Sequence, residues 1–205
     1  MKRWMVSLVF LTGCASPGLQ EMPATFAIQA RRVEAASPPW NLHQIRSEGT
    51  EAIQGAEDVV IAVVDTGVDA HHPQLQGRLL PMIDRVGNDR FWWNDKAYDY
   101  TGTDGNGHGT HVCGIVSSVL GKSKVWILPI KSIPHTGIGD DRAIASGIRA
   151  AVDYRDPAHP SRRVRAINLS VGGKTKSKSM QEALEYAQSR DVLLVVSAGN
   201  DGIGV

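Results

Sequence analysis

The chain of 205 residues has only two cysteines, no long run of basic residues and no apolar segment long enough to cross a bilayer. Its 22 basic and 21 acidic side chains give a net charge of +1, so a nucleic-acid partner is not expected. No internal repeat or low-complexity segment occurs. With 42% hydrophobic and 21% charged residues, the composition is that of one globular domain with a substantial core.

The first residues have the pattern of an export signal. Lys2 and Arg3 precede a short apolar stretch, residues 4–11, and Leu11-Thr12-Gly13-Cys14 resembles the processing box of bacterial lipoproteins. We expect a signal peptide over residues 1–13 and a diacylglycerol on Cys14, which would tether an extracytoplasmic cell-envelope lipoprotein to a membrane. Ala15 after the cysteine favours the outer membrane, if the source has one. A plain secretory signal is the alternative.

The remaining chain divides into a linker and one domain. Residues 14–38 have no sustained hydrophobic period and carry proline near both ends, which is typical of a linker. From residue 39 to residue 205, apolar runs without polar alternation indicate strands buried on both faces. These runs cover residues 59–64, 125–130, 164–171 and 192–196.

Helical patterns lie between the apolar runs. Apolar residues after His108 recur with helical spacing, the pair Asp140-Asp141 opens a second helix, and Ser179 with Glu182 forms a capping box for a third. Strands that alternate with helices predict an α/β fold, a parallel sheet in three layers with helices on both faces.

The sequence Asp65-Thr66-Gly67 after the first apolar run suits two unrelated kinds of protease. An aspartic protease uses Asp-Thr-Gly to share a water molecule between two carboxylates, whereas a serine protease triad needs a buried aspartate to orient a histidine. The aspartic protease fold is almost entirely β, so the predicted helices favour the triad.

Three short motifs occur in order along the predicted elements. They are VVIAVVDTGVD with Asp65, GNGHGTHVCG with His108, and VVSAGN with Asn200. Each by itself also suits a simple structural part: a turn after a strand, a helix start or a loop. Together they resemble the N-terminal part of a subtilisin-like (subtilase, peptidase S8) serine protease catalytic domain, incomplete at the C-terminus, with further similarity at residues 39–45, 72–75 and 167–173.

The resemblance implies a role for each motif residue. Asp65 would fix the tautomer of His108, His108 would remove the proton of a serine hydroxyl, and the side-chain amide of Asn200 would stabilise the oxyanion. The same resemblance assigns a peptide substrate to two backbone edges, along which it would lie as an added strand. These edges contain Gly137, Ile138 and Gly139, and Ser170, Val171 and Gly172.

The nucleophile of this family is not in the chain. Subtilases carry it in Gly-Thr-Ser-Met-Ala, which does not occur here, so the chain as written should not cleave peptides by the triad route. Two interpretations stay open. The chain is a fragment of an active serine endopeptidase, or it is a lipid-anchored peptide-binding pseudoprotease.

Other residues permit further interpretations. His71, His72, His108 and His111 do not form a His-Glu-x-x-His zinc motif, so we expect no catalytic metal, and triad chemistry requires no cofactor. The carboxylates Asp95, Asp99 and Asp104 are either a structural calcium site, which subtilase loops often hold, or solvated loop residues. We expect His111 to be packed in its helix. Cys113 has no partner for a disulfide if Cys14 is lipidated; it is either a small buried residue or a thiol close to His108.

Overall fold

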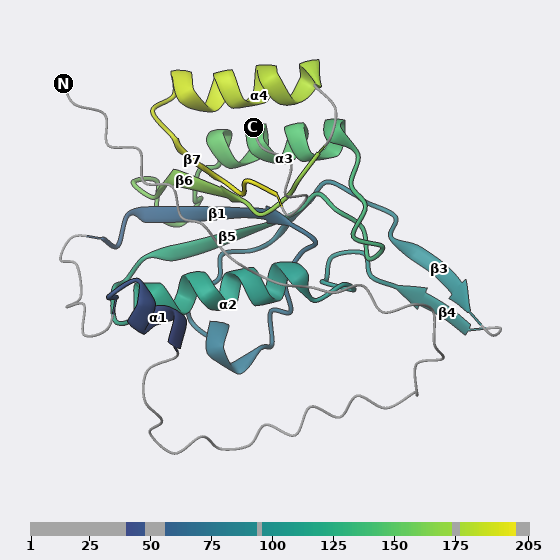
Figure 1. The fold of residues 1–205 in the computed structure, drawn as a ribbon, viewed down its shortest axis with the longest axis horizontal. Coiled ribbons are helices and arrows are strands. Elements are labelled where there is room, and N and C mark those ends of the chain that lie inside the picture. The colour runs from purple at the N-terminus through teal and green to yellow at the C-terminus, as the bar shows by residue number, and fades with distance from the viewer. Residues whose placement is uncertain (1–39, 48–55, 94–95, 174–176, 200–205) are drawn as a thin grey trace.

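The fold is built on one parallel sheet of five strands (Figure 1). The computed structural model of the chain describes residues 40–47, 56–93, 96–173 and 177–199. The strand order is β2-β5-β1-β6-β7, and every neighbouring pair is parallel. The strands are β1 (Val59–Asp65), β2 (Ile83–Asp84), β5 (Trp126–Lys131), β6 (Arg163–Leu169) and β7 (Leu193–Val196).

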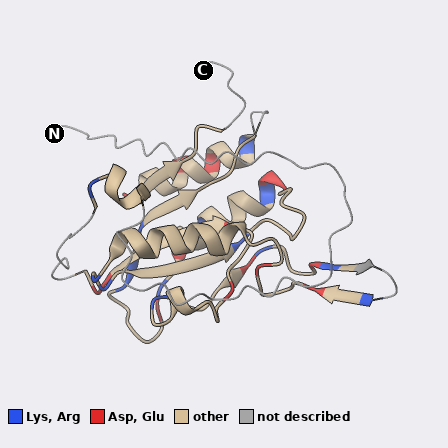
Figure 2. Cartoon of the chain, turned by 60° about the horizontal axis from the view of Figure 1, so that its bottom comes forward, with Lys and Arg blue, Asp and Glu red and all other residues tan. Residues whose placement is uncertain are grey.

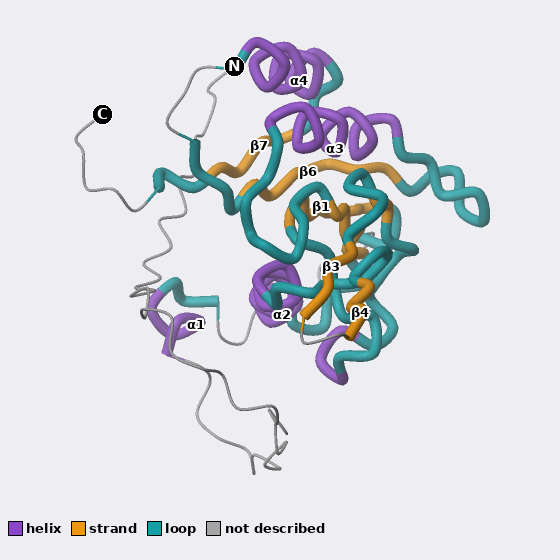
Figure 3. Tube along the Cα trace, turned by 90° about the vertical axis from the view of Figure 1, so that its right-hand side faces the viewer, coloured by secondary structure: helices purple, strands orange, loops and turns teal. Residues whose placement is uncertain are grey.

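Helices cover both faces of this sheet, as Figure 3 shows. Helix α2 (His108–Leu120) lies on one face, and α3 (Asp141–Asp153) and α4 (Lys178–Ser189) lie on the other. The predicted three-layer α/β fold is therefore confirmed. Among the described residues, no helix has both the length and the apolar composition needed to span a bilayer.

Smaller elements complete the described part of the chain. A short helix α1 (Trp40–Gln44) precedes the sheet, and a 3-10 turn (Pro73–Leu75) follows β1. Strands β3 (Arg90–Trp93) and β4 (Lys96–Asp99) form a separate antiparallel hairpin, which projects at the right of Figure 1.

Two apolar clusters fill the space between the layers. Val60 and Val64 of β1 pack in the cluster below α3 and α4, whereas Val63 packs with Val112 and Cys113 of α2. Successive side chains of a strand point to opposite faces, so a strand covered on both faces must be apolar throughout. Helix α2 contains no Lys, Arg, Asp or Glu and is drawn entirely in tan in Figure 2.

The helix caps were predicted with one error. Asp140 caps α3, and its side chain accepts a hydrogen bond of 2.7 Å from the backbone N of Arg142, as expected. Helix α4 begins two residues earlier than predicted, because Ser177 rather than Ser179 is its cap. Ser177 has the extended backbone that a cap requires, and its hydroxyl accepts from the backbone N of Met180.

Strand β7 differs from the expectation of burial on both faces. Its residues Leu193 and Val196 are 60% and 51% exposed. β7 is the edge of the sheet and, among the described strands, pairs only with β6; α4 contacts it and Leu194 packs against the core, while Leu193 and Val196 stay exposed. The apolar pattern correctly predicted a strand here, but it does not show which elements cover the two faces of that strand.

Candidate active site

Asp65 and His108 lie at the end of a strand and at the start of a helix that pack against each other. Asp65 is the last residue of the central strand β1, and the residue is completely buried. His108 is the first residue of α2, and Gly107 before it adopts the left-handed conformation with φ of 93°. Because the chain must turn sharply from the loop into the helix, glycine is favoured at that position.

A direct hydrogen bond joins the two side chains. Asp65 Oδ1 lies 2.8 Å from His108 Nδ1 and also accepts a bond of 2.7 Å from the backbone N of Thr66. A carboxylate can only accept, so Nδ1 carries the hydrogen, and the neutral ring keeps Nε2 as a base. The bond to Asp65 raises the pKa of His108, although partial burial of the ring opposes the shift.

Asp104 fixes the start of α2 relative to the end of β1. Thr66 Oγ1 donates to Asp104 Oδ1 (2.9 Å) and accepts from the backbone N of Gly109 (2.9 Å). The same carboxylate accepts from the backbone N of Gly107 and from both the backbone N and the hydroxyl of Thr110. Burial alone would raise the pKa of Asp104, but the bonds from Thr110, Gly107 and Thr66 outweigh it and lower the pKa.

The two backbones approach so closely that Gly109 tolerates no side chain. A Cβ built on Gly109 would lie 2.2 Å from the carbonyl oxygen of Gly67. Gly67 itself has φ of 112°, and a Cβ there would lie 2.8 Å from Thr103 O. These two glycines let the helix dock against the turn after Asp65, which brings His108 within hydrogen-bond distance.

The predicted substrate-binding residues follow the two strands that flank β1. Gly137, Ile138 and Gly139 come after β5, and Ser170 to Gly172 come after β6. The topology places both segments at the carboxyl edge of the sheet on either side of Asp65, where parallel α/β sheets bind ligands. Ile138 is 80% exposed. Their role in substrate binding stays a prediction.

Several predicted features lie outside the described residues. They are the signal peptide 1–13, the lipidation site Cys14, the linker 14–38, the calcium candidate Asp95 and the oxyanion residue Asn200.

A buried charged network next to the site was missed in the sequence. Lys131 Nζ lies 2.9 Å from Asp89 Oδ2, and His135 Nδ1 lies 2.6 Å from Asp89 Oδ1. Lys131 is fully buried at the end of β5. The signal that could have found the network is this lysine directly after an apolar run, because a buried ammonium group requires a carboxylate nearby.

The remaining metal and cysteine candidates have defined positions. Asp99 pairs with Arg90 at 2.7 Å, and Asp104 binds protein donors as described above. Within the described ranges, no group of three or more His, Cys, Asp or Glu side chains could hold a metal ion. His111 is exposed, so its expected packing was wrong: it lies on the solvent side of α2. Cys113 is a buried free thiol, as the first interpretation expected.

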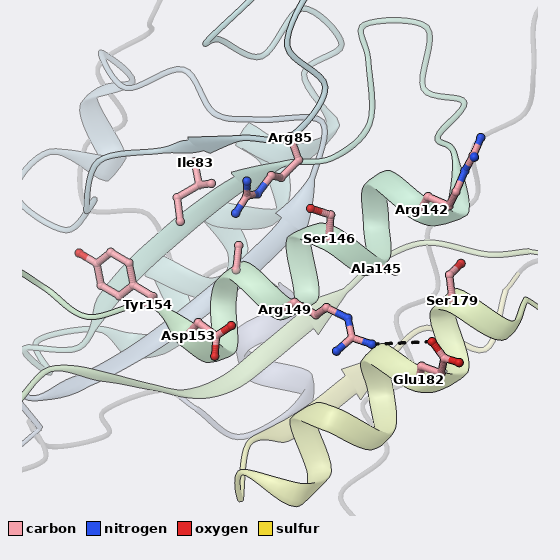
Figure 4. A pocket seen from close by; sticks show the side chains of 11 residues that line it. Ile83, Arg85, Arg142, Ala145, Ser146, Arg149, Asp153, Tyr154, Ser179 and Glu182 are labelled. Carbon is pink, nitrogen blue, oxygen red and sulfur yellow. Dashed lines mark ion pairs between the residues drawn. The ribbon is translucent and has the colours of Figure 1, made fainter.

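A cavity of about 540 Å³ lies elsewhere, between α3, α4 and the β2 edge (Figure 4). Arg149 and Glu182 line it and approach each other to 4.0 Å, as the dashed line in Figure 4 marks. Neither Asp65 nor His108 lines it. The cavity is therefore separate from the candidate active site.

Comparisons with known proteins agree with this geometry. A family model described as "Subtilase family" matches residues 56–204. The chain belongs to the subtilase family. This result favours the triad interpretation of Asp65-Thr66-Gly67 over the aspartic protease.

Individual subtilases match over much of this chain. Thermitase of Thermoactinomyces vulgaris is 35% identical over 150 residues, which are 69% of this chain and 47% of thermitase. An intracellular serine protease of Paenibacillus polymyxa is 30% identical over 181 residues, 85% of this chain and 48% of that protein. The structure of sphericase matches with a TM-score of 0.63 and 27% identity, covering 83% of this chain and 55% of sphericase. The chain spans about half the length of these relatives.

Proposed function

We propose that the chain is the N-terminal part of a serine endopeptidase whose nucleophilic serine lies outside residues 1–205. The observation that carries the proposal is the 2.8 Å bond between the buried Asp65 and His108 at the carboxyl end of the central strand. A histidine that is oriented in this way can remove the proton of a serine hydroxyl through Nε2, and the buried carboxylate stabilises the imidazolium that forms.

The remaining steps assign roles to the predicted site residues. An extended peptide would pair with the backbone of Gly137 to Gly139 on one side and of Ser170 to Gly172 on the other, which favours broad side-chain specificity. The amide of Asn200 would donate to the tetrahedral oxyanion, and loss of one such donor generally lowers kcat by about 10²–10³-fold. No cofactor takes part in this chemistry.

Exposed apolar surface supports a further covering segment. Leu193 and Val196 of β7 are more than half exposed, and Ile115 and Val119 of α2, a helix without a charged side chain, are partly exposed. Such surfaces favour a longer enzyme over a pseudoprotease made of these residues alone.

An activity-based label tests the proposal in the protein that the natural gene encodes, read to its own stop codon. A peptide phosphonate that reacts with activated serine should label the wild-type protein, whereas Asp65→Ala and His108→Ala should lower the labelling rate by at least about 10³-fold. His111→Ala is the matched control, because this exposed histidine lies three residues away on the same helix. A wild-type protein that binds peptides but resists the phosphonate would be a pseudoprotease.

We propose further that a lipid on Cys14 holds the protein outside the cytoplasm, in the cell envelope. The support is the short apolar segment after Lys2 and Arg3, followed by Leu11-Thr12-Gly13-Cys14. Radioactive palmitate should be incorporated by cells that express the wild-type protein and not by cells that express Cys14→Ser. Equal incorporation, or a soluble wild-type protein after cell fractionation, would contradict the anchor.

A further inference from the structure

A buried ion pair ties the region before the β3–β4 hairpin to the end of β5. Lys131 and Asp89 are 0% and 3% exposed, and their charged groups lie 2.9 Å apart. Lys131 Nζ also donates to the backbone O of Thr66, which directly follows Asp65. Removing either partner would leave the other charge unpaired in the interior, so the pair fixes Asp89 at this position.

Asp89 in turn holds His135 by two groups. Asp89 Oδ2 accepts from the backbone N of His135 at 2.9 Å, and Asp89 Oδ1 lies 2.6 Å from the ring Nδ1. Burial alone would raise the pKa of Asp89, but the bonds from Lys131 and His135 outweigh it and lower the pKa. The carboxylate is therefore charged at neutral pH, and charge-assisted bonds of this kind are among the stronger ones in proteins.

Aromatic rings in and next to the β3–β4 hairpin pack against the ring of His135. The ring of Phe91 stacks on His135 with centroids 4.5 Å apart and an interplanar angle of 15°, and the Tyr100 ring lies 5.4 Å from it. Tyr98 stacks on the ring of Phe91 at 5.0 Å. Tyr100 also packs directly against Gly105, where a Cβ would lie 2.3 Å from the ring. These rings thus contact both the loop before His108 and the loop after β5.

The two loops are also bonded to each other. Asn106 Nδ2 donates to the backbone O of His135 at 2.9 Å, and Asn106 lies two residues before His108. Immediately after His135 come Gly137 and the exposed Ile138, on the proposed edge for peptide binding. His135 is therefore held by Asp89, by the rings and by Asn106, at the place where the two loops meet.

We propose that His135 is a positioning residue that sets the spacing between the loop 101–107 and the loop 133–139, and thereby aligns an extended peptide beside His108. The inference rests on the proposed function. The hairpin β3–β4 supplies the rings that hold the histidine, so it acts on substrate binding without touching the reacting atoms. Its effect should appear only with substrates long enough to lie along the loop 133–139.

The test compares two substrates in the complete gene product. Under the proposed function, a tetrapeptide anilide is long enough to lie along the loop 133–139, whereas N-acetyl-tyrosine ethyl ester is too short to reach it. For His135→Ala we expect KM for the anilide to rise about three- to tenfold, which corresponds to the loss of one hydrogen bond of ordinary strength. The kcat values for both substrates, and the KM for the ester, should stay within about twofold of the wild-type values. His135→Phe, which keeps an aromatic ring to stack on Phe91, and His135→Gln, which keeps a donor for Asp89, should give smaller rises in KM.

Hydrogen exchange gives a second readout that does not depend on catalysis. In His135→Ala the amides of residues 136–139 should exchange at least about tenfold faster, while amides of β1 keep the wild-type rate. His159→Ala, an exposed histidine in the loop before β6, is the matched control and should change neither measurement.

The outcomes separate the two proposals. Unchanged exchange of residues 136–139, or an equal loss of activity on both substrates, would overturn the positioning role while the peptidase stands. A wild-type protein that cleaves neither substrate would overturn the proposed function and this inference with it.

Discussion

Asp65 Oδ1 lies 2.8 Å from His108 Nδ1, and this contact joins the last residue of a buried strand to the first residue of a helix 43 positions further along the chain. The strand fixes the position of the carboxylate and the helix start fixes the position of the ring, so the two groups are held within hydrogen-bond distance by the fold. The ring is half exposed, whereas the carboxylate is buried.

The bond to Asp65 predicts how His108 titrates. Since this bond raises the pKa of the ring, His108 should stay protonated to a higher pH than the ordinary histidine value of about 6.5. The neutral base forms only above that pKa, so the acidic limb of a pH–activity profile should lie above the ordinary value.

Asp65→Asn tests this titration by removing the charge while keeping the shape. The pKa of His108, measured by NMR from the ring proton shifts, should fall in this variant. A raised pKa in the folded state contributes stability that is fully present below the unfolded pKa and is lost as pH rises through the folded pKa. The stability contributed by this bond should therefore shrink over that range, and an unchanged His108 pKa would contradict the assignment.

The hydroxyl of Thr66 should matter more than its methyl group. It bridges Asp104 and the backbone N of Gly109, so Thr66→Val leaves a buried donor unsatisfied and should lower the free energy of unfolding by about 1–3 kcal/mol. Thr66→Ser keeps the hydroxyl and should cost less. Urea unfolding of both variants measures the difference, and equal losses would show that the hydroxyl bridge is unimportant.

Two glycines of α2 should respond in opposite ways to alanine. Gly109→Ala places a Cβ against the carbonyl of Gly67, so overpacking should destabilise the protein by about 2–3 kcal/mol and displace His108. Gly114→Ala meets only the Gln74 side chain at 3.7 Å and should stabilise the helix by about 0.5–1 kcal/mol. Thermal unfolding of the pair provides the comparison; similar melting temperatures would disprove the close approach.

Cys113 should be an unreactive thiol in the folded protein. Burial, followed by the charges of Asp65 and Asp104, raises its pKa to about 12. At pH 8 the reactive thiolate would be about one molecule in ten thousand, far below that of a free cysteine. In a Cys14→Ser protein, iodoacetamide should therefore label Cys113 slowly in buffer and rapidly in urea. Fast labelling of the native protein, with loss of activity, would instead support a thiol accessible beside His108.

The sequence was sufficient for four of the five strands of the parallel sheet, for the three long helices and for the two principal site residues, but it did not predict β2 or the β3–β4 hairpin. An apolar run such as residues 59–64 is stable only in a strand that is covered on both faces. Asp65 lies at the end of such a strand, and His108 lies at the start of a helix. Their bond was expected from the resemblance of the two motifs to those of subtilases, and both residues lie at the carboxyl edge of the sheet.

Contacts between distant segments could not be predicted in the same way. The choice of Ser177 over Ser179 as a cap depends on where the backbone of residues 177–180 turns, and the two serines, two positions apart, have the same side-chain chemistry. The exposure of Leu193 depends on which neighbours β7 has. The role of Asp104 was also misjudged, because its donors come from Thr66, which lies 38 residues away, as well as from Gly107 and Thr110.

By itself, the sequence determined the α/β class and the alternation of the main strands and helices, because hydrophobic periodicity is a local property; the pairing of Asp65 with His108 followed from the resemblance of short motifs to a known family. Only the tertiary structure decided that Lys131, Asp89 and His135 form one buried network and that Asn106 joins the two loops. Such contacts depend on the path of the hairpin between them. A charge buried away from water must find its partner in space, and the order of residues along the chain does not state where that partner lies.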